Sequence, residues 1–320
     1  MARQIFRAIL AFAILGTLPA TAQQFPSKPI RVIVAIAAGS PTDVIMRMAS
    51  KELQRSLGQP LTIDNRPGGE MVVGSELCAR SAPDGYTLCV VSNTAVSINP
   101  HIFPKLPYDP DRDFKPVTAL WRLIQGIIVS ASLPVNSIGE LQALAAAKPG
   151  VLNSGTMGAG GADLHRRWLN DQWNTNIVGV PYKGANLVMN ALLGGEIQMS
   201  LMAVGGLRGQ LKAGKVKLLV VGSSKRLAQF PDVPTYAEAG LEASPRTWWA
   251  LLAPAGTPDP MVKRLNAEFV RLFNEPKFAA YLESQFVESA VSSPEEFAAL
   301  LKKDRERAGV MVRKYNLGGR

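Results

Sequence analysis

The chain of 320 residues is 47% hydrophobic and 19% charged, so it can bury the core of one large domain or of two lobes, and disorder is excluded. Its formal net charge is +10, but the basic residues are mixed with acidic ones and form no run longer than two. This pattern argues against a nucleic-acid partner. It is typical of a solubilising surface, or of a surface that steers anionic ligands.

Residues 1–22 have the features of a secretory signal peptide. Basic Arg3 and Arg7 precede an apolar run at 9–18, and an Ala-Thr-Ala sequence that suits signal peptidase ends at Ala22. The apolar run is shorter than the ~20 residues that a membrane-spanning helix needs. We therefore predict cleavage after Ala22 and export to the periplasm, with a buried N-terminal helix as the alternative.

The next segment predicts a buried strand followed by an amphipathic helix. Residues 31–37 are short, continuous and β-branched, as in a buried strand. Ser40 then stands at a helix N-cap position, with Pro41 first and Asp43 third in the helix, which is close to a capping box. Gly58 ends the helical pattern.

The same alternation of strands and helices continues along the chain. Further strands are expected at 61–64, 86–91, 177–180, 197–202 and 217–222, with another beginning near Val151. Helices are expected through Cys78 and at 138–147, 186–193, 260–273, 277–284 and 294–315. Such alternation predicts mostly parallel sheets flanked by helices. Because no low-complexity linker separates the halves, two lobes joined by crossing strands are favoured over two independent domains.

The chain has two cysteines, Cys78 and Cys89, and export would place them in an oxidising compartment. Cys78 lies late in a predicted helix and Cys89 lies in the following strand, so a disulfide is favoured. Two buried thiols, or a catalytic thiol, remain alternatives because the sequence does not give the Cβ geometry. Only His101 and His165 could complete a metal site with them, so we expect no metal ion.

Three junctions between a strand and a helix carry small polar residues at the strand ends, where open α/β sheets bind ligands. The first holds Ala38, Gly39, Ser40, Thr42 and Asp43, the second holds Asn93, Thr94 and Ser97, and the third holds Thr156, Met157, Gly158, Ala159 and Gly160. Helix N-termini present unpaired N–H groups, so each junction could hold a carboxylate. Ordinary capping and turn chemistry is the alternative.

The sequence lacks the common enzyme motifs. Residues 209–215 have the GxxxxGK spacing of a phosphate-binding loop, but Val216 replaces the required Ser or Thr. The segment is also expected to end a helix and lead into a strand, which is the wrong context for such a loop. A catalytic triad would have to use His101 or His165. We expect neither an enzyme nor a bound cofactor, and we keep a secreted α/β hydrolase or lyase, and a ligand-free structural envelope protein, as alternatives.

Ten short segments, in order, resemble the extracytoplasmic solute receptors of tripartite tricarboxylate transporters, the Bug family. They are FPSKPIR at 25–31, the loop at 39–43, NRPG at 65–68, APDGYTL at 82–88, INP at 98–100, LPYDP at 106–110, VPYKG at 180–184, LLGG at 192–195, PDVPT at 231–235 and LLAPAGTP at 251–258. Each segment alone is weak evidence for the resemblance. Their number and order make the resemblance specific, and it runs from Phe25 nearly to the C-terminus.

The resemblance implies an α/β type II periplasmic-binding-protein fold. Each of its two lobes would be a mostly parallel sheet flanked by helices, with a double crossover hinge. Residues 23–123 plus 246–320 would form lobe 1 and residues 124–245 lobe 2. The cleft would close on a small organic acid, and a monomer would deliver that acid to a membrane permease or to a sensor protein. In the family's loops, the matching positions are Gly39, Thr42, Asp43, Thr94, Ser97, Thr156, Gly158 and Gly160.

Several residues depart from the family pattern. Ser40 replaces a usual glycine, Gly-Ala-Asp at 161–163 replaces frequent hydroxyl residues, and Met202 stands where an aspartate is frequent. These changes indicate a less polar pocket, suited to an aromatic or monocarboxylic acid. Trp248, near Arg246, could line this pocket, although core packing is the ordinary role of such a residue.

Overall fold

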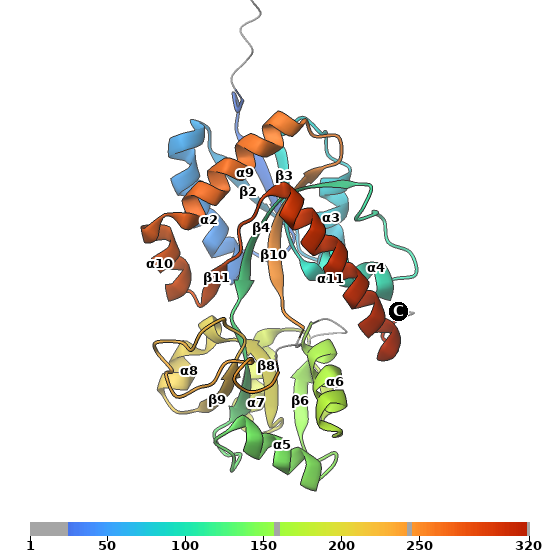
Figure 1. Ribbon diagram of the computed structural model, residues 1–320, viewed down its shortest axis with the longest axis vertical. Coiled ribbons are helices and arrows are strands. Elements are labelled where there is room, and N and C mark those ends of the chain that lie inside the picture. The colour runs from blue at the N-terminus through green and yellow to red at the C-terminus, as the bar shows by residue number, and fades with distance from the viewer. Residues whose placement is uncertain (1–24, 157–160, 242–244, 319–320) are drawn as a thin grey trace, which may run out of the picture.

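The computed structural model describes residues 25–156, 161–241 and 245–318. The predicted signal peptide with its cleavage site after Ala22, and the predicted site residues Met157, Gly158, Ala159 and Gly160, lie outside these ranges. The described chain forms two lobes, one at each end of an elongated molecule, joined by long strands that run between them (Figure 1). Of the helices in these ranges, none combines the length and the hydropathy needed to cross a bilayer.

Lobe 1 is built on a six-stranded sheet in the order β11-β4-β10-β3-β1-β2. Its strands are β1 (Ile30–Val34), β2 (Leu61–Asn65), β3 (Thr87–Ser92), β4 (Phe114–Leu123), β10 (Trp248–Pro254) and β11 (Val287–Ser289). Its helices are α2 (Pro41–Leu57), α3 (Val72–Ala79), α4 (Asn99–Ile102), α9 (Asp259–Asn274), α10 (Pro276–Ser284) and α11 (Pro294–Lys314), with short helical turns η1 (Gly69–Met71) and η2 (Thr94–Ile98).

Lobe 2 is built on a five-stranded sheet in the order β7-β6-β8-β5-β9. Its strands are β5 (Gln125–Ser130), β6 (Asn153–Thr156), β7 (Val178–Pro181), β8 (Met199–Ala203) and β9 (Val216–Val221). Its helices are α5 (Ile138–Ala147), α6 (Gly161–Trp173), α7 (Ala185–Gly194) and α8 (Arg208–Lys212), with the turn η3 (Val204–Leu207).

Both sheets are mixed, whereas the sequence predicted mostly parallel ones. The β-α-β units give the parallel pairs β1–β2, β1–β3, β6–β7 and β6–β8. The chain enters lobe 2 from β4 into β5 and returns from β9 to β10, and these strands pair antiparallel with their neighbours. The two-lobed α/β arrangement is as predicted, and the antiparallel part of each sheet comes from the strands that carry the chain between lobes.

Helix α2 begins and ends where its sequence predicts. The Ser40 hydroxyl accepts a hydrogen bond from the Asp43 backbone N–H at 3.2 Å, and Pro41 opens the first turn. Gly58 ends the helix in the left-handed conformation, with φ of 71°. The apolar face between these caps packs into the lobe 1 core and fixes the start of α2 at the end of β1. The buried residues on this face are Ile45, Met46, Ala49, Leu53 and Leu57.

The predicted disulfide is present. Cys78 in α3 and Cys89 in β3 are bonded, with a Cα–Cα distance of 6.0 Å, and both residues are fully buried. The bond holds α3 against the central strands of lobe 1. It also closes a loop of about a dozen residues, which restricts the unfolded chain.

The C-terminal helix α11 contacts both lobes. In lobe 1 its Arg305 donates to the Val96 carbonyl at 2.9 Å. Its last turn reaches α6 of lobe 2, where Lys314 pairs with Asp171 at 2.5 Å. Met311 shares an apolar cluster with Trp168 of α6. Figure 1 shows the end of α11 beside α6, so α11 is a non-covalent connection between the lobes in addition to the crossing strands.

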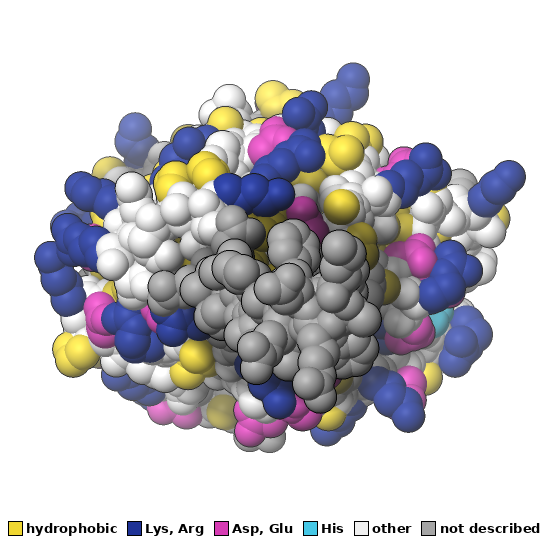
Figure 2. All heavy atoms as spheres, turned by 90° about the horizontal axis from the view of Figure 1, so that it is seen from above, with side chains coloured by type: hydrophobic (Ala, Val, Ile, Leu, Met, Phe, Trp, Pro, Cys, Tyr) yellow, Lys and Arg dark blue, Asp and Glu magenta, His cyan; other side chains and the backbone are white. Residues whose placement is uncertain are grey.

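Charged side chains are dispersed over the free end of lobe 1. Figure 2 shows Lys and Arg side chains around its edge, interspersed with Asp and Glu. Many charged side chains of lobe 1 form ion pairs in the described part of the chain, such as Lys28 with Asp84 at 3.4 Å and Arg112 with Asp113 at 2.8 Å. This face therefore has the mixed surface that the composition predicted, without a single basic patch.

Candidate functional site

The first two predicted loops leave strand ends that face the boundary between the lobes. β1 and β3 are adjacent parallel strands, so the loops that follow them leave the same edge of the lobe 1 sheet. Gly39 and Pro41 line one hollow together with Ala203 and Gly205 of lobe 2. Asn93 lines another hollow together with Gly161 at the start of α6. The first two loops therefore face lobe 2 across a cleft.

The first loop presents backbone N–H groups in a fixed conformation. The Gly39 N–H donates to Asp43 Oδ2 at 2.9 Å, and Arg47 Nε donates to both oxygens of Asp43 at 3.0 Å. Ala38 and Gly39 are exposed. Within the described ranges, the N–H groups of Ala38 and Thr42 have no hydrogen-bond partner. An anion could bind at these two groups, where the helix dipole is positive.

Asp43 stabilises this loop, and its carboxylate oxygens already accept hydrogen bonds from Gly39 and Arg47. Burial raises the pKa of Asp43, but Arg47, the Gly39 N–H and Asn65 together lower it below its ordinary value. The carboxylate is therefore charged at neutral pH, and Arg47 compensates its charge. Asp43 thus holds Gly39 in place. The exposed backbone of Ala38 and Gly39 remains available to bind a ligand.

The second loop is divided between the cleft and the protein interior. Asn93 is 7% exposed, and its Nδ2 donates to the carbonyl of Arg246 at 3.1 Å. The Thr94 N–H donates to the Ser92 hydroxyl at 3.2 Å. Ser97 is fully buried. Asn93 therefore lies at the cleft, while Ser97 lies behind the loop.

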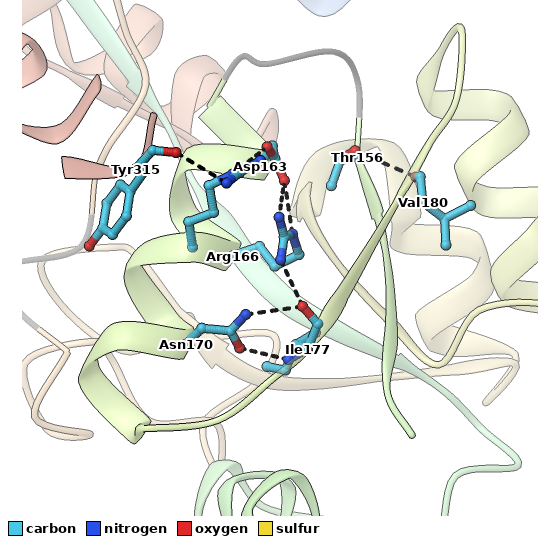
Figure 3. A network of polar contacts seen from close by, with 8 residues as sticks. Thr156, Asp163, Arg166, Asn170, Ile177, Val180 and Tyr315 are labelled. Carbon is cyan, nitrogen blue, oxygen red and sulfur yellow. Dashed lines mark hydrogen bonds and ion pairs between the residues drawn. The ribbon is translucent and has the colours of Figure 1, made fainter. Parts of the chain in front are cut away.

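The third loop lies largely outside the described ranges, and the residues on either side of it have specific polar contacts. Thr156 is buried, and its hydroxyl donates to the Val180 carbonyl at 3.5 Å. At the start of α6, Asp163 accepts hydrogen bonds from Arg166 at 2.6 and 2.8 Å and from Arg167 at 2.9 Å (Figure 3). The negative charge that the sequence places near this helix start is therefore neutralised by two guanidinium groups.

Two predicted site residues lie in apolar clusters. Met202 is 6% exposed and packs in the core of lobe 2. Trp248 is 4% exposed and packs edge to face on Phe297, with 5.7 Å between ring centroids. The structure thus places both residues in the cores, at the ends of strands that lead to the cleft.

A small hollow between the lobes contains residues that the loop motifs did not include. We call it the inter-lobe pocket, and its polar lining consists of Asn93, Arg246, Thr247, Asp304 and Arg307. Asp304 comes from α11, more than 200 residues after Asn93. One sequence signal could have found it, because Asp304 is an acid on the otherwise apolar stripe that Leu301, Ala308 and Met311 form.

His165 is buried in the protein, and His101 is partly buried. His165 is 2% exposed between the rings of Trp168 and Tyr236, and burial lowers its pKa to about 4. His101 Nε2 lies 3.0 Å from the carbonyl of Arg305. Neither is placed to act as a general base in the cleft. Within the described part of the chain there is also no cluster of His, Cys, Asp or Glu that could hold a metal ion.

The chain matches a known family over most of its length. The model of the tripartite tricarboxylate transporter family receptor matches residues 45–317. A protein of Pseudomonas sp. (strain P51), called UPF0065 protein in the tcbD-tcbE intergenic region, is 32% identical over 320 residues. The match covers 97% of this chain and 94% of that protein.

Solved structures agree with this match. A structure described as a periplasmic transporter is 34% identical to this chain, with a TM-score of 0.80, and the match covers 92% of this chain and 99% of that one. R. palustris Rpa4515 with adipate is 26% identical, with a TM-score of 0.82, and the match covers 91% and 98%. These likenesses confirm the predicted two-lobed fold and the predicted absence of enzymatic activity. The chain belongs to the tripartite tricarboxylate transporter receptor family, a family of non-catalytic solute receptors.

Proposed function

We propose that this protein is a periplasmic receptor that binds a small organic carboxylate between its lobes. The observation that carries this proposal is the start of α2, where Gly39 and Pro41 line a hollow with Ala203 and Gly205 of lobe 2, and where the N–H groups of Ala38 and Thr42 lack partners within the described ranges. The adipate bound to the related Rpa4515 supports the same ligand class.

The proposed site uses the three loops together. One ligand carboxylate binds at the start of α2, the loop after β3 forms one wall, and the loop before α6 closes from lobe 2. The residues of this site are Ala38, Gly39, Ser40, Thr42, Asp43, Asn93, Thr94, Ser97, Thr156, Met157, Gly158, Ala159 and Gly160, with Met202 and Trp248 behind them. Hydrogen bonds to a charged group contribute about 1.5–3 kcal/mol each, so four of them reach the ~8 kcal/mol of micromolar binding.

Closure of the lobes completes the proposed cycle. Residues 23–123 plus 246–320 would move as one body and residues 124–245 as the other, about the strands that cross between them. The protein would be exported by a signal peptide cleaved after Ala22 and act as a monomer. The closed form would be presented to the membrane subunits of a tripartite transporter, or to a sensor protein.

Thermal unfolding against a panel of organic acids tests this function. The panel contains adipate, plain monocarboxylates, tricarboxylates and the corresponding neutral amides. We expect at least one acid to raise the unfolding midpoint by several degrees and to reduce the radius of gyration in solution scattering, while its amide does neither. If no acid stabilises the protein, the carboxylate assignment fails and a structural role without a ligand is favoured.

A further inference from the structure

The hollow at the start of α2 also has a cationic side chain of lobe 2 in its wall. Gly39 and Pro41 line this hollow from lobe 1, and Arg208 of α8 lines it from lobe 2. We call it the α2 hollow. Its volume is about 290 Å³, close to the ~300 Å³ at which small-molecule sites begin. Because both groups line one hollow, one small acid can contact the start of α2 and Arg208 together.

Contacts with lobe 1 hold the guanidinium of Arg208 in place. Its Nη2 donates to the Ser284 carbonyl at 2.5 Å, and its Cζ lies 5.3 Å from the centre of the Phe286 ring. In the same wall, a Cβ atom on Gly205 would lie only 2.7 Å from the Gln285 carbonyl, so the two lobes meet closely here. The guanidinium is thus positioned before a ligand binds, which lowers the entropy lost on binding.

The charge of Arg208 has no acidic partner within the described ranges. Its two contacts in lobe 1 are a carbonyl and an aromatic ring, and both are uncharged. None of the described residues that line the α2 hollow is acidic. A guanidinium has five N–H donors, and the Ser284 carbonyl accepts from one nitrogen only. Arg208 therefore keeps enough donors for a carboxylate, the anion whose geometry a guanidinium matches best.

Apolar side chains form another part of the wall. Val44 of α2, Leu123 at the end of β4 and Phe286 all line the α2 hollow. Val44 is 45% exposed, so a hydrocarbon chain lying against it would remove apolar surface from water. The α2 hollow therefore matches a ligand that has an aliphatic chain with an acidic group at each end.

We propose that Arg208 binds a second carboxylate of the ligand, so that the protein selects linear aliphatic dicarboxylates over monocarboxylates. This inference rests on the proposed function, in which the first carboxylate binds at the start of α2. The ligand differs from the aromatic or monocarboxylic acid that the sequence indicated, because that expectation did not consider Arg208. Ser284 and Phe286 are positioning residues, since they act through the guanidinium.

Calorimetric titration with matched acids tests the inference. Succinate, glutarate, adipate and pimelate are each compared with the monocarboxylate of the same chain length and with their own half-amide, which has nearly the same shape and one charge less. In the unmodified protein, we expect the best dicarboxylate to bind at least tenfold more tightly than both counterparts. In Arg208→Gln, this preference should fall below threefold, while the affinity for the monocarboxylate changes less than threefold.

Three further variants keep the result interpretable. Lys212→Gln removes an exposed cation of the same helix that does not line the α2 hollow, and it should retain the full preference. Arg208→Lys keeps the charge without the paired N–H groups, and it should retain a preference of at least threefold. Arg208→Met keeps an apolar stem against Phe286 and replaces the glutamine variant if that variant does not fold.

Ionic strength gives a readout that a purely structural role of Arg208 would not change. Arg208 is exposed, so salt should screen its interaction with an anion. Raising the ionic strength from about 0.05 M to about 0.5 M should reduce the preference of the unmodified protein for the dicarboxylate at least twofold. In Arg208→Gln the remaining preference should not depend on salt.

The outcomes separate this inference from the proposed function. Half-amides that bind as tightly as the dicarboxylates, or a preference that survives Arg208→Gln, would overturn the inference and leave the carboxylate receptor intact. An equal loss of affinity for monocarboxylate and dicarboxylate in Arg208→Gln would also overturn it, because Arg208 would then only support the fold. If no acid binds at all, both the inference and the proposed function fail.

Discussion

The starts of α2 and α6 are similar in sequence, but the aspartate at each start binds different partners. Each helix follows a strand, has an aspartate at its third position and has an arginine four residues later, Arg47 or Arg167. In α2, Asp43 accepts a hydrogen bond from the Gly39 N–H and so fixes the loop that follows β1 in its own lobe. In α6, Asp163 is occupied by Arg166 and Arg167, and Arg167 also donates to the Tyr315 carbonyl at 3.1 Å (Figure 3).

The difference shows how one local pattern serves two roles. The α2 aspartate organises a surface for a ligand, and its arginine partner is about half exposed. The α6 aspartate is part of a buried ion network that connects lobe 2 to the end of α11 in lobe 1. Spacing along the helix predicts the ion pair in both cases. Only the tertiary structure decides which neighbour takes the remaining hydrogen bonds.

The largest effect is expected from removing Asp163. In Asp163→Ala the guanidinium of Arg166, with 12% of its side chain exposed, loses its carboxylate. Breaking a buried pair in this way costs about 3–5 kcal/mol, so the free energy of unfolding in urea should fall by that amount. A loss below about 1 kcal/mol would show that this network does not stabilise lobe 2.

Acid should destabilise the protein through His165, the second buried ionisable residue of α6. The unfolded chain binds a proton near pH 6.5, while the folded chain binds it only near pH 4. Stability is therefore lost as the pH falls from 6.5 to 4, by about 3 kcal/mol from this group. Urea titrations at pH 7 and pH 4 should show a smaller difference for His165→Leu than for the unmodified protein. Equal differences in the two proteins would contradict this assignment.

Removing Asp43 should affect the ligand more than the fold. In Asp43→Ala, Arg47 stays solvated and α2 keeps its Ser40 cap, so we expect a loss of only about 1–2 kcal/mol in unfolding free energy. Gly39 loses the acceptor that holds its N–H, so the affinity for the best carboxylate should fall at least tenfold. Thermal unfolding and calorimetry on the same sample separate the two effects. Unchanged affinity would contradict the role given to this loop.

The smallest effect is expected at the outer contact between α6 and α11. Lys314 and Asp171 form an ion pair at the surface, with 52% and 35% of their side chains exposed. Such pairs contribute about 0–1 kcal/mol, so Lys314→Ala should change the unfolding free energy by less than about 1 kcal/mol. This variant is the matched control for Asp163→Ala, because both lie on the same connection between the lobes. An equal loss in the two variants would show that burial does not distinguish these contacts.

The local elements were predictable from the sequence. Ser40, Pro41 and Gly58 define α2 by themselves, and the short separation of Cys78 from Cys89 across one turn predicted their disulfide. Caps, turns and apolar periodicity act over a few residues, so they can be read in order along the chain.

The arrangement of distant segments was not predictable in the same way. The antiparallel insertion of β10 between β3 and β4 depends on pairing between strands far apart in sequence. Ser97 follows a loop that suits a ligand, yet it is buried behind that loop. Asp304 reaches the cleft only because α11 packs across both lobes. Such positions follow from tertiary packing, and the single local sign among them, an acid on the apolar stripe of α11, does not say what Asp304 packs against.

Calorimetry on the first loop tests the central claim most directly. Ala38→Glu places a negative charge on the exposed backbone where the carboxylate is proposed to bind, and Val151→Glu places the same charge at an exposed position before β6. The account predicts that Ala38→Glu weakens binding of the best carboxylate at least tenfold, while Val151→Glu leaves it within twofold of the unmodified protein. Equal affinity in all three proteins would contradict a carboxylate site at the start of α2.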